Sequence, residues 1–142
     1  MSQEVDFGQL VSAMGDAVVV SDADGAIIVW NSAAERIFGF SEAEAMGRSL
    51  DLITPERHRQ RHWDGYAKTM RTGVTRYGAD VLRVPAIHKD GRALSIAFTV
   101  GLLHGADQSV VGIAAIIRDE TKRWAEERQM RQRLTELEAR TV

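Results

Sequence analysis

The 142-residue chain contains no cysteine, only two prolines and few aromatic residues, which make up 6% of the sequence. The lack of cysteine excludes disulfide bonds, thiolate nucleophiles and cysteine-ligated zinc or iron–sulfur centres. A net charge of −2 disfavours a general nucleic-acid-binding protein, which is normally basic. No apolar run approaches the roughly 18–20 residues that a membrane span needs, and the first ten residues do not resemble a signal peptide. We therefore expect a cytoplasmic protein that binds neither nucleic acid nor a membrane.

Catalytic motifs are also missing from the sequence. There is no nucleophile elbow, no phosphate-binding loop and no His-Glu-x-x-His zinc motif. The carboxylates fall in predicted turns and on helix surfaces, so that no pair of them is set apart for acid–base chemistry. Flavin photochemistry through a cysteine adduct is excluded as well. The sequence therefore predicts a protein that is not an enzyme.

The pattern of apolar residues predicts a domain of mixed helices and strands, long enough to form a hydrophobic core without disulfides. The β-branched run at 16–21 and the apolar run at 26–30 flank an Asp/Gly turn and predict an antiparallel hairpin. Three helices are expected next, followed by three strands between Val74 and Arg118. This order indicates an α+β domain with one five-stranded antiparallel sheet and helices on one face.

Capping residues predict where the helices between the hairpin and the later strands begin. We expect Asn31-Ser32 to cap the first of them, with Glu35 as the capping-box partner of Ser32. Thr54-Pro55-Glu56 is a stronger start signal, because it combines a cap, a proline at the first helical position and an acid in the first turn. The helix that it opens is expected to run to about Arg71.

The composition changes after Asp119 to that of a charged helix. Residues 120–142 contain no glycine or proline and combine six basic with five acidic residues. Its narrow apolar seam consists of Met130, Leu134 and Leu137. Such a seam either pairs with a second copy of the helix or folds back on its own domain, and the sequence leaves both open. We expect three regions, namely an N-terminal helical cap at 1–15, the domain at 16–119 and a signalling helix at 120–142.

Five short motifs, taken together and in order, resemble those of a PAS domain over about residues 10–123. They are Asp24-Gly25-x-Ile27, Asn31-x-x-Ala34, Phe38-Gly39-Phe40-Ser41-x-x-Glu44-x-x-Gly47, Lys89-Asp90-Gly91 and Arg118-Asp119-x-Thr121. The resemblance implies the PAS fold and a sensory role in signal transduction, with the signal passing through the C-terminal helix. It also implies a homodimer formed by the flanking helices, and a separate output protein such as a kinase or regulator.

The predicted helix that Thr54-Pro55-Glu56 opens carries a narrower resemblance. Pro55-Glu56-x-x-Arg59-x-x-His62, followed by Met70-x-Thr72-Gly73, is similar to the heme-binding PAS domains of bacterial oxygen-sensor kinases and phosphodiesterases. In those domains a histidine seven residues after the proline is the proximal iron ligand, and His62 stands at that position. The resemblance therefore implies heme b bound through His62, and sensing of a diatomic gas such as O2, CO or NO.

The same resemblance implies which residues would surround the heme. In the oxygen-sensing kinases an arginine early in the next strand contacts bound oxygen, but Leu82 occupies this position here. Its neighbour Arg83 should point to the opposite face of the strand. The expected wall is apolar, so CO or NO is as plausible a ligand as O2. The wall residues are Leu82, Phe98, Val100 and Tyr77, and the expected partners of the heme propionates are Lys68 and Arg76.

Other interpretations of these residues stay open. A lone histidine in a charged helix is usually solvated, so a cofactor-free PAS dimerisation module is an alternative, as is a PAS domain that binds a fatty acid or a flavin. His58 and His62 would lie on one helix face, but no convincing further metal ligands lie near them in the sequence. Trp30, Trp63 and Trp124 are expected to serve in packing.

Overall fold

Five antiparallel strands form one sheet, in the spatial order β2-β1-β5-β4-β3. The computed structural model describes residues 4–75 and 80–141. Its strands are β1 (Ala17–Asp22), β2 (Ile27–Trp30), β3 (Leu82–Ile87), β4 (Ala93–His104) and β5 (Val110–Asp119). The strongly apolar β5 takes the central position, with β1 paired to one of its edges and β4 to the other. The expected sheet and its hairpin β1–β2 are confirmed.

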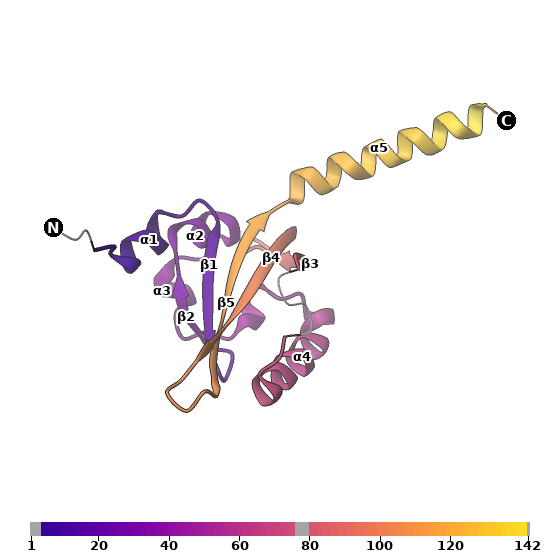
Figure 1. Ribbon diagram of the computed structural model, residues 1–142. Helices are drawn as coiled ribbons and strands as arrows, with labels where there is room; N and C mark the ends of the chain where they lie inside the picture. The colour runs from indigo at the N-terminus through magenta and orange to yellow at the C-terminus, as the bar shows by residue number, and fades with distance from the viewer. Residues whose placement is uncertain (1–3, 76–79, 142) are drawn as a thin grey trace.

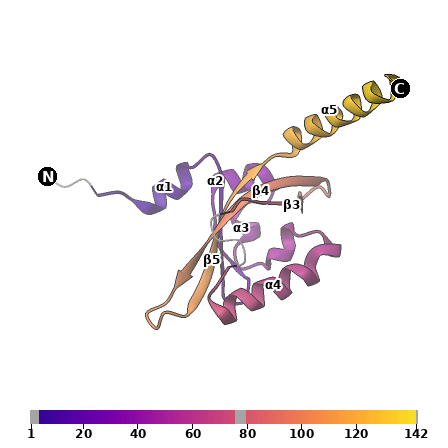
Figure 2. The same cartoon turned by 45° about the vertical axis from the view of Figure 1, so that its right-hand side comes forward.

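The helices lie between β2 and β3 and at both ends of the chain (Figures 1 and 2). They are α1 (Phe7–Ala13), α2 (Ser32–Phe38), α3 (Glu42–Ala45), the 3₁₀ turns η1 (Leu50–Ile53) and η2 (Glu56–His58), α4 (Arg59–Thr72) and α5 (Thr121–Arg140). Helices α2, α3 and α4 lie on the same side of the sheet, as predicted for this class of fold. Within residues 4–75 and 80–141, no helix has the length and apolar character of a membrane span.

The face of the sheet that carries these helices, called the inner face below, forms the hydrophobic core. Strand pairing places Val19 of β1 opposite Ala115 of β5, and Ala115 opposite Val100 of β4, so that these three residues share this face. Trp30 and Phe38 pack against each other with their ring centroids 5.4 Å apart. Both are almost fully buried, so the expected packing role of Trp30 is confirmed.

A single buried asparagine, Asn31, joins three elements near the start of the domain. Its Oδ1 atom accepts hydrogen bonds from the backbone N–H groups of Val18 in β1 and Ala34 in α2. Its Nδ2 group donates to the carbonyl oxygens of Val11 in α1 and of Asp16. The Asn31 side chain therefore uses two donors and two acceptor sites, and it holds α1, β1 and α2 at one point.

The helix starts differ in detail from the prediction. Asn31 is the N-cap of α2, so the expected capping box of Ser32 with Glu35 is wrong. The Glu35 carboxylate instead accepts a hydrogen bond from the backbone N–H of Glu42, 2.7 Å away, and so joins α2 to the start of α3. The helix predicted to run from Thr54-Pro55-Glu56 to about Arg71 opens as the 3₁₀ turn η2, and its regular α-helical part begins at Arg59.

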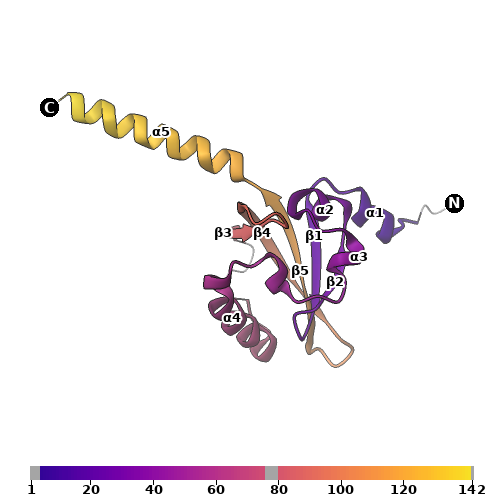
Figure 3. The same ribbon diagram turned by 180° about the vertical axis from the view of Figure 1, so that it is seen from behind.

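Helix α5 extends away from the rest of the domain (Figures 1 and 3). None of its twenty residues is buried. Met130, Leu134 and Leu137, the predicted apolar seam, are 71%, 57% and 57% exposed. Of the two arrangements that the sequence left open, folding back on the domain is therefore not the one found. The seam remains uncovered within one copy of the chain.

Replacing Asn31 by aspartate should destabilise the domain strongly. The carboxylate keeps the two acceptor sites but loses both donors, and it places a negative charge beside the Val11 and Asp16 carbonyl oxygens. We expect the free energy of unfolding to fall by about 2–3 kcal/mol, measured by urea denaturation. The control is Ser41→Ala, which removes the exposed cap of α3 and should cost only about 1 kcal/mol. Equal losses in the two variants would contradict this role of Asn31.

Candidate functional site

One stripe of large side chains on α4 faces the rest of the domain. It consists of Arg59, His62, Trp63 and Tyr66, whose spacing of three and four residues places them on one helix face. We call this set the α4 stripe. Tyr66 is the one buried residue of the helix. The indole ring of Trp63 lies over Gly25, whose φ of +82° and close approach to the ring both favour glycine in the β1–β2 turn.

Arg59 and Trp63 attach the first turns of α4 to the preceding segment η1. The Arg59 guanidinium donates to the carbonyl oxygens of Thr54 and Asp51, at 3.1 and 3.2 Å. The indole N–H of Trp63 donates to the Asp51 carboxylate at 2.7 Å. Asp51 therefore receives hydrogen bonds from both side chains, and it holds the N-terminal half of the helix in place.

Tyr66 attaches the middle of α4 to strand β1. Its hydroxyl oxygen lies 2.9 Å from the Ser21 hydroxyl oxygen. It also donates a hydrogen bond to the carbonyl oxygen of Asp22. Burial raises the pKa of Tyr66, so the hydroxyl is protonated and acts as a donor.

His62 is the member of the α4 stripe whose buried polar atom has no partner. Its Nδ1 atom is inaccessible to solvent and forms no hydrogen bond with any residue in the described part of the chain. The rings of Trp63 and Tyr66 lie beside it, with centroids 4.7 and 5.9 Å away, and they also contact each other. Burial lowers the pKa of His62, and the Asp51 carboxylate offsets this only in part. A neutral imidazole with an unused nitrogen suits metal ligation.

The predicted wall residues share the inner face of the sheet. Leu82 pairs with Phe98 across β3 and β4, and Val100 follows two residues later on β4. All three are half-buried. Val84 lies on the same face and is 39% exposed. The β3–β4 part of the inner face is therefore apolar but incompletely covered.

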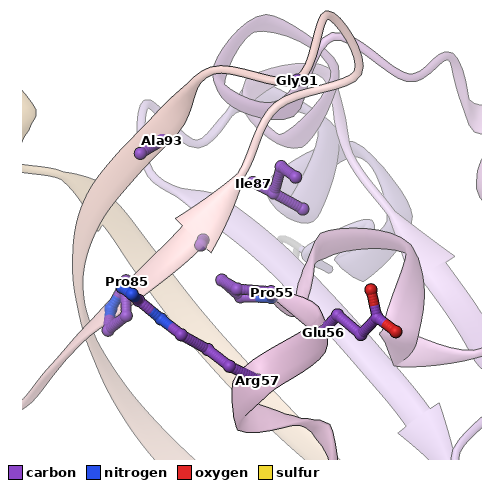
Figure 4. A pocket seen from close by; sticks show the side chains of 8 residues that line it. Pro55, Glu56, Arg57, Pro85, Ile87, Gly91 and Ala93 are labelled. Atoms are coloured by element: carbon purple, nitrogen blue, oxygen red, sulfur yellow. The ribbon is translucent and has the colours of Figure 1, made fainter.

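Two open clefts lie beside this region. The first, of about 580 Å³, lies between η2 and the β3–β4 hairpin (Figure 4). It is lined by Pro55, Glu56, Arg57, Pro85, Ala86, Ile87, Gly91 and Ala93. The second, of about 530 Å³, is lined by Ala23, Asp24, Trp63, Tyr66, Ala67, Met70 and Arg71. Neither cleft is lined by His62 or by the described wall residues.

The other predicted site residues are not brought together. Lys68 is exposed and takes part in none of the ion pairs found among residues 4–75 and 80–141. Arg76 and Tyr77 lie outside the described residues. His58 accepts a hydrogen bond from Arg57 at its Nε2 atom. The described residues contain no group of three histidine, aspartate or glutamate side chains that could hold a metal ion.

Arg83 lies on the outer face of the sheet, as the alternation along β3 predicts, and contacts the start of α5. Its Nε atom is 3.3 Å from the Glu120 carboxylate. The backbone N–H of Glu120 donates to the carbonyl oxygen of Ser95 in β4. The Ser95 N–H in turn donates to the Thr121 hydroxyl at 3.0 Å. Strands β3 and β4 therefore both contact the residues from which α5 begins.

Comparison with known proteins agrees with this arrangement of sheet and helices. A family model described as the PAS fold matches residues 6–119. The chain belongs to the PAS family. A sensory PAS domain of signal transduction is thus the general role of this chain. The expected fold, with its five-stranded antiparallel sheet and flanking helices, is confirmed.

Two curated relatives match most of this PAS domain. The sensor protein FixL of Bradyrhizobium diazoefficiens is 30% identical over 142 residues, which cover 99% of this chain and 27% of that protein. The oxygen sensor protein DosP of Escherichia coli is 25% identical over 126 residues, 89% of this chain and 15% of that protein. The chain thus spans about a quarter or less of the length of these relatives.

Solved structures show the same fold. The PAS domain of a protein from Colwellia psychrerythraea has a TM-score of 0.71 and 25% identity, over 82% of this chain and 95% of that one. An RNA-binding light-oxygen-voltage receptor has a TM-score of 0.69 and 18% identity, over 91% of this chain and 36% of that one. The second likeness concerns the fold alone.

Sequence reasoning missed three residues that hold α4 in place, namely Ser21, Asp51 and Tyr66. For Tyr66 a signal was available, because it stands four residues after His62 and three after Trp63 on a predicted helix. Ser21 and Asp51 come from other segments of the chain. No local pattern marks them, since their role depends on where α4 packs.

The lowered pKa of His62 predicts how stability depends on pH. Below pH 6.5, the ordinary pKa of histidine, His62 takes up a proton in the unfolded chain but resists protonation in the folded protein. The contribution of His62 to the free energy of unfolding is therefore fully present above pH 6.5. It is lost as the pH falls through the lowered pKa of the folded state. We expect the thermal midpoint to fall between about pH 7 and 5, and His62→Gln to flatten this dependence.

Circular dichroism melts over this range test the prediction, with His104→Gln as the control at an exposed histidine. Glu44 does not interfere, because its hydrogen bond to Lys89 lowers its pKa to about 2. An unchanged slope in His62→Gln would show that another group is responsible.

Proposed function

We propose that this PAS domain binds heme b through His62 and senses a diatomic gas. The observation that carries the proposal is the buried, unpartnered Nδ1 atom of a histidine whose pKa is lowered. Every other member of the α4 stripe has its polar group hydrogen-bonded. A buried imidazole nitrogen without a hydrogen-bond partner is costly unless a ligand uses it.

The relatives support the proposal in kind. DosP is named an oxygen sensor and FixL a sensor protein. His62 also stands seven residues after Pro55, the position of the iron ligand in the heme-binding PAS domains that the sequence resembles. Because this chain spans only part of such relatives, its output is a separate proposal. We infer that the signal passes to a kinase or another regulator.

The residues present fit heme b in their chemistry. When bound, the heme would supply an iron atom that can take O2, CO or NO as a ligand. The proposed residues are His62 as the iron ligand, Leu82, Phe98, Val100 and Tyr77 as the apolar wall, and Lys68 and Arg76 as partners of the propionates.

Strand β3 offers the route from the ligand to the output helix. Leu82 lies on the inner face, and its neighbour Arg83 reaches Glu120 at the start of α5. A shift of β3 on ligand binding therefore changes the position of a side chain that pairs with the first residues of α5. Glu120 is well suited to respond, because its side chain is only 16% exposed.

An absorption spectrum of protein expressed with an ample heme supply tests the heme proposal. We expect a Soret band at about 400–430 nm that collapses or shifts in His62→Ala. The matched control is His58→Ala, one helical turn away, which should leave the band unchanged. A colourless protein that also refuses added hemin would overturn the proposal. A yellow protein would replace heme by flavin.

We also propose that two copies of the chain pair through α5. Its apolar seam of Met130, Leu134 and Leu137 is more than half exposed, and Trp124 nearby is 50% exposed. Most of the stability of a helix in a protein comes from the packing of its apolar face, so α5 gains from covering the seam. A second copy offers the same seam, and the surrounding charges of both signs allow the two helices to approach.

Introducing a charge into the seam should weaken the dimer. Leu134→Glu places an unpaired carboxylate at the helix contact, and we expect the dissociation constant to rise roughly tenfold or more. Sedimentation equilibrium measures this, with Gln132→Glu as a control of the same charge outside the seam. Equal masses for wild type and Leu134→Glu at all concentrations would contradict pairing through α5.

A further inference from the structure

Tyr66 is the one place where α4 contacts the inner face of the sheet through buried polar groups. Its side chain is 8% exposed, and Ser21, which it meets, is 3% exposed. The phenol has a single hydrogen, which it donates to the Asp22 carbonyl oxygen. The Ser21 hydroxyl must therefore be the donor in the 2.9 Å bond to the Tyr66 oxygen. This arrangement satisfies both buried hydroxyls.

These hydrogen bonds restrict the rotation of α4 about its own axis. Successive residues of a helix are about 100° apart, so His62 and Tyr66 differ by only about 40° in direction. Fixing the direction of the Tyr66 side chain therefore fixes that of His62. Arg59 and Trp63 attach the N-terminal half of the helix to η1, but neither reaches the sheet through a hydrogen bond.

We propose that the Tyr66 hydroxyl is a positioning group, which keeps the imidazole of His62 turned toward the core through its bonds to Ser21 and Asp22. The inference deepens the proposed function and rests on it, because an imidazole nitrogen must point in a fixed direction to bind the heme iron. Without the hydroxyl the phenyl ring still packs against His62. The helix then loses its polar attachment to β1, and the imidazole turns more readily toward solvent.

The rate at which diethyl pyrocarbonate modifies each histidine tests this in the heme-free protein. In Tyr66→Phe we expect the rate at His62 to rise roughly fivefold, the factor that corresponds to one lost hydrogen bond. His104, which is exposed, is the internal reference and should not change. Peptide mass spectrometry resolves the histidines. Ser41→Ala, which weakens the domain at α3, controls for general loss of stability.

Two results would overturn the proposal. One is an unchanged rate at His62 in a folded Tyr66→Phe protein, and the other is an equal rise in Ser41→Ala. Should Tyr66→Phe fail to fold, Ser21→Ala keeps the phenol and its bond to Asp22 and should give a smaller rise at His62. No rise in that variant would count equally against the proposal.

Titration with hemin separates this inference from the proposed function. If both hold, the dissociation constant for hemin increases in Tyr66→Phe while the Ser41→Ala value stays at that of wild type. If hemin binds to none of the proteins but the modification rate at His62 still rises, the heme proposal fails and the positioning role of Tyr66 stands. If hemin binds equally well to all of them and the rate does not change, Tyr66 has no such role.

Discussion

The fold depends on the amide of Asn31, which is buried and uses two donors and two acceptor sites within the chain. A buried amide that loses its partners is costly, so the segments around it are held in one arrangement. That arrangement sets the start of β1, which pairs with the central strand β5. Ser21 is the other buried polar side chain of the described residues. At the far end of β1 its hydroxyl bonds to Tyr66 and so holds α4.

The two ends of β1 differ in what surrounds these polar contacts. Around Asn31 lies the close-packed core of Trp30 and Phe38. Around Ser21 the helix α4 adds only Tyr66 to the buried set. An element held by a few hydrogen bonds over incompletely covered apolar surface opens at lower free energy than the core does. A region of that kind suits a ligand-sensing role, since a bound ligand can signal only by shifting an element, here α4, that is able to move.

The predictable part of the molecule is the part governed by local pattern. Short-range periodicity and alternation predicted the hairpin β1–β2 and three further strands between Val74 and Arg118. The alternation also placed Arg83 opposite to Leu82. The predicted capping box of α2 was wrong by one residue, because Asn31 and Ser32 are both good N-cap residues. The choice between them depends on Val11, Val18 and Asp16, which lie in other segments of the chain.

The sequence by itself determined the class of the fold, the order of its elements and the position of His62 on a helix, because these follow from periodicity and caps within short windows. Only the tertiary structure decided that Tyr66 reaches Ser21, 45 residues earlier, and that Nδ1 of His62 is buried without a partner. It also decided that α5 stands away from the sheet. The physical reason is the same in each case: burial and hydrogen bonding of a side chain depend on which distant segments pack against it.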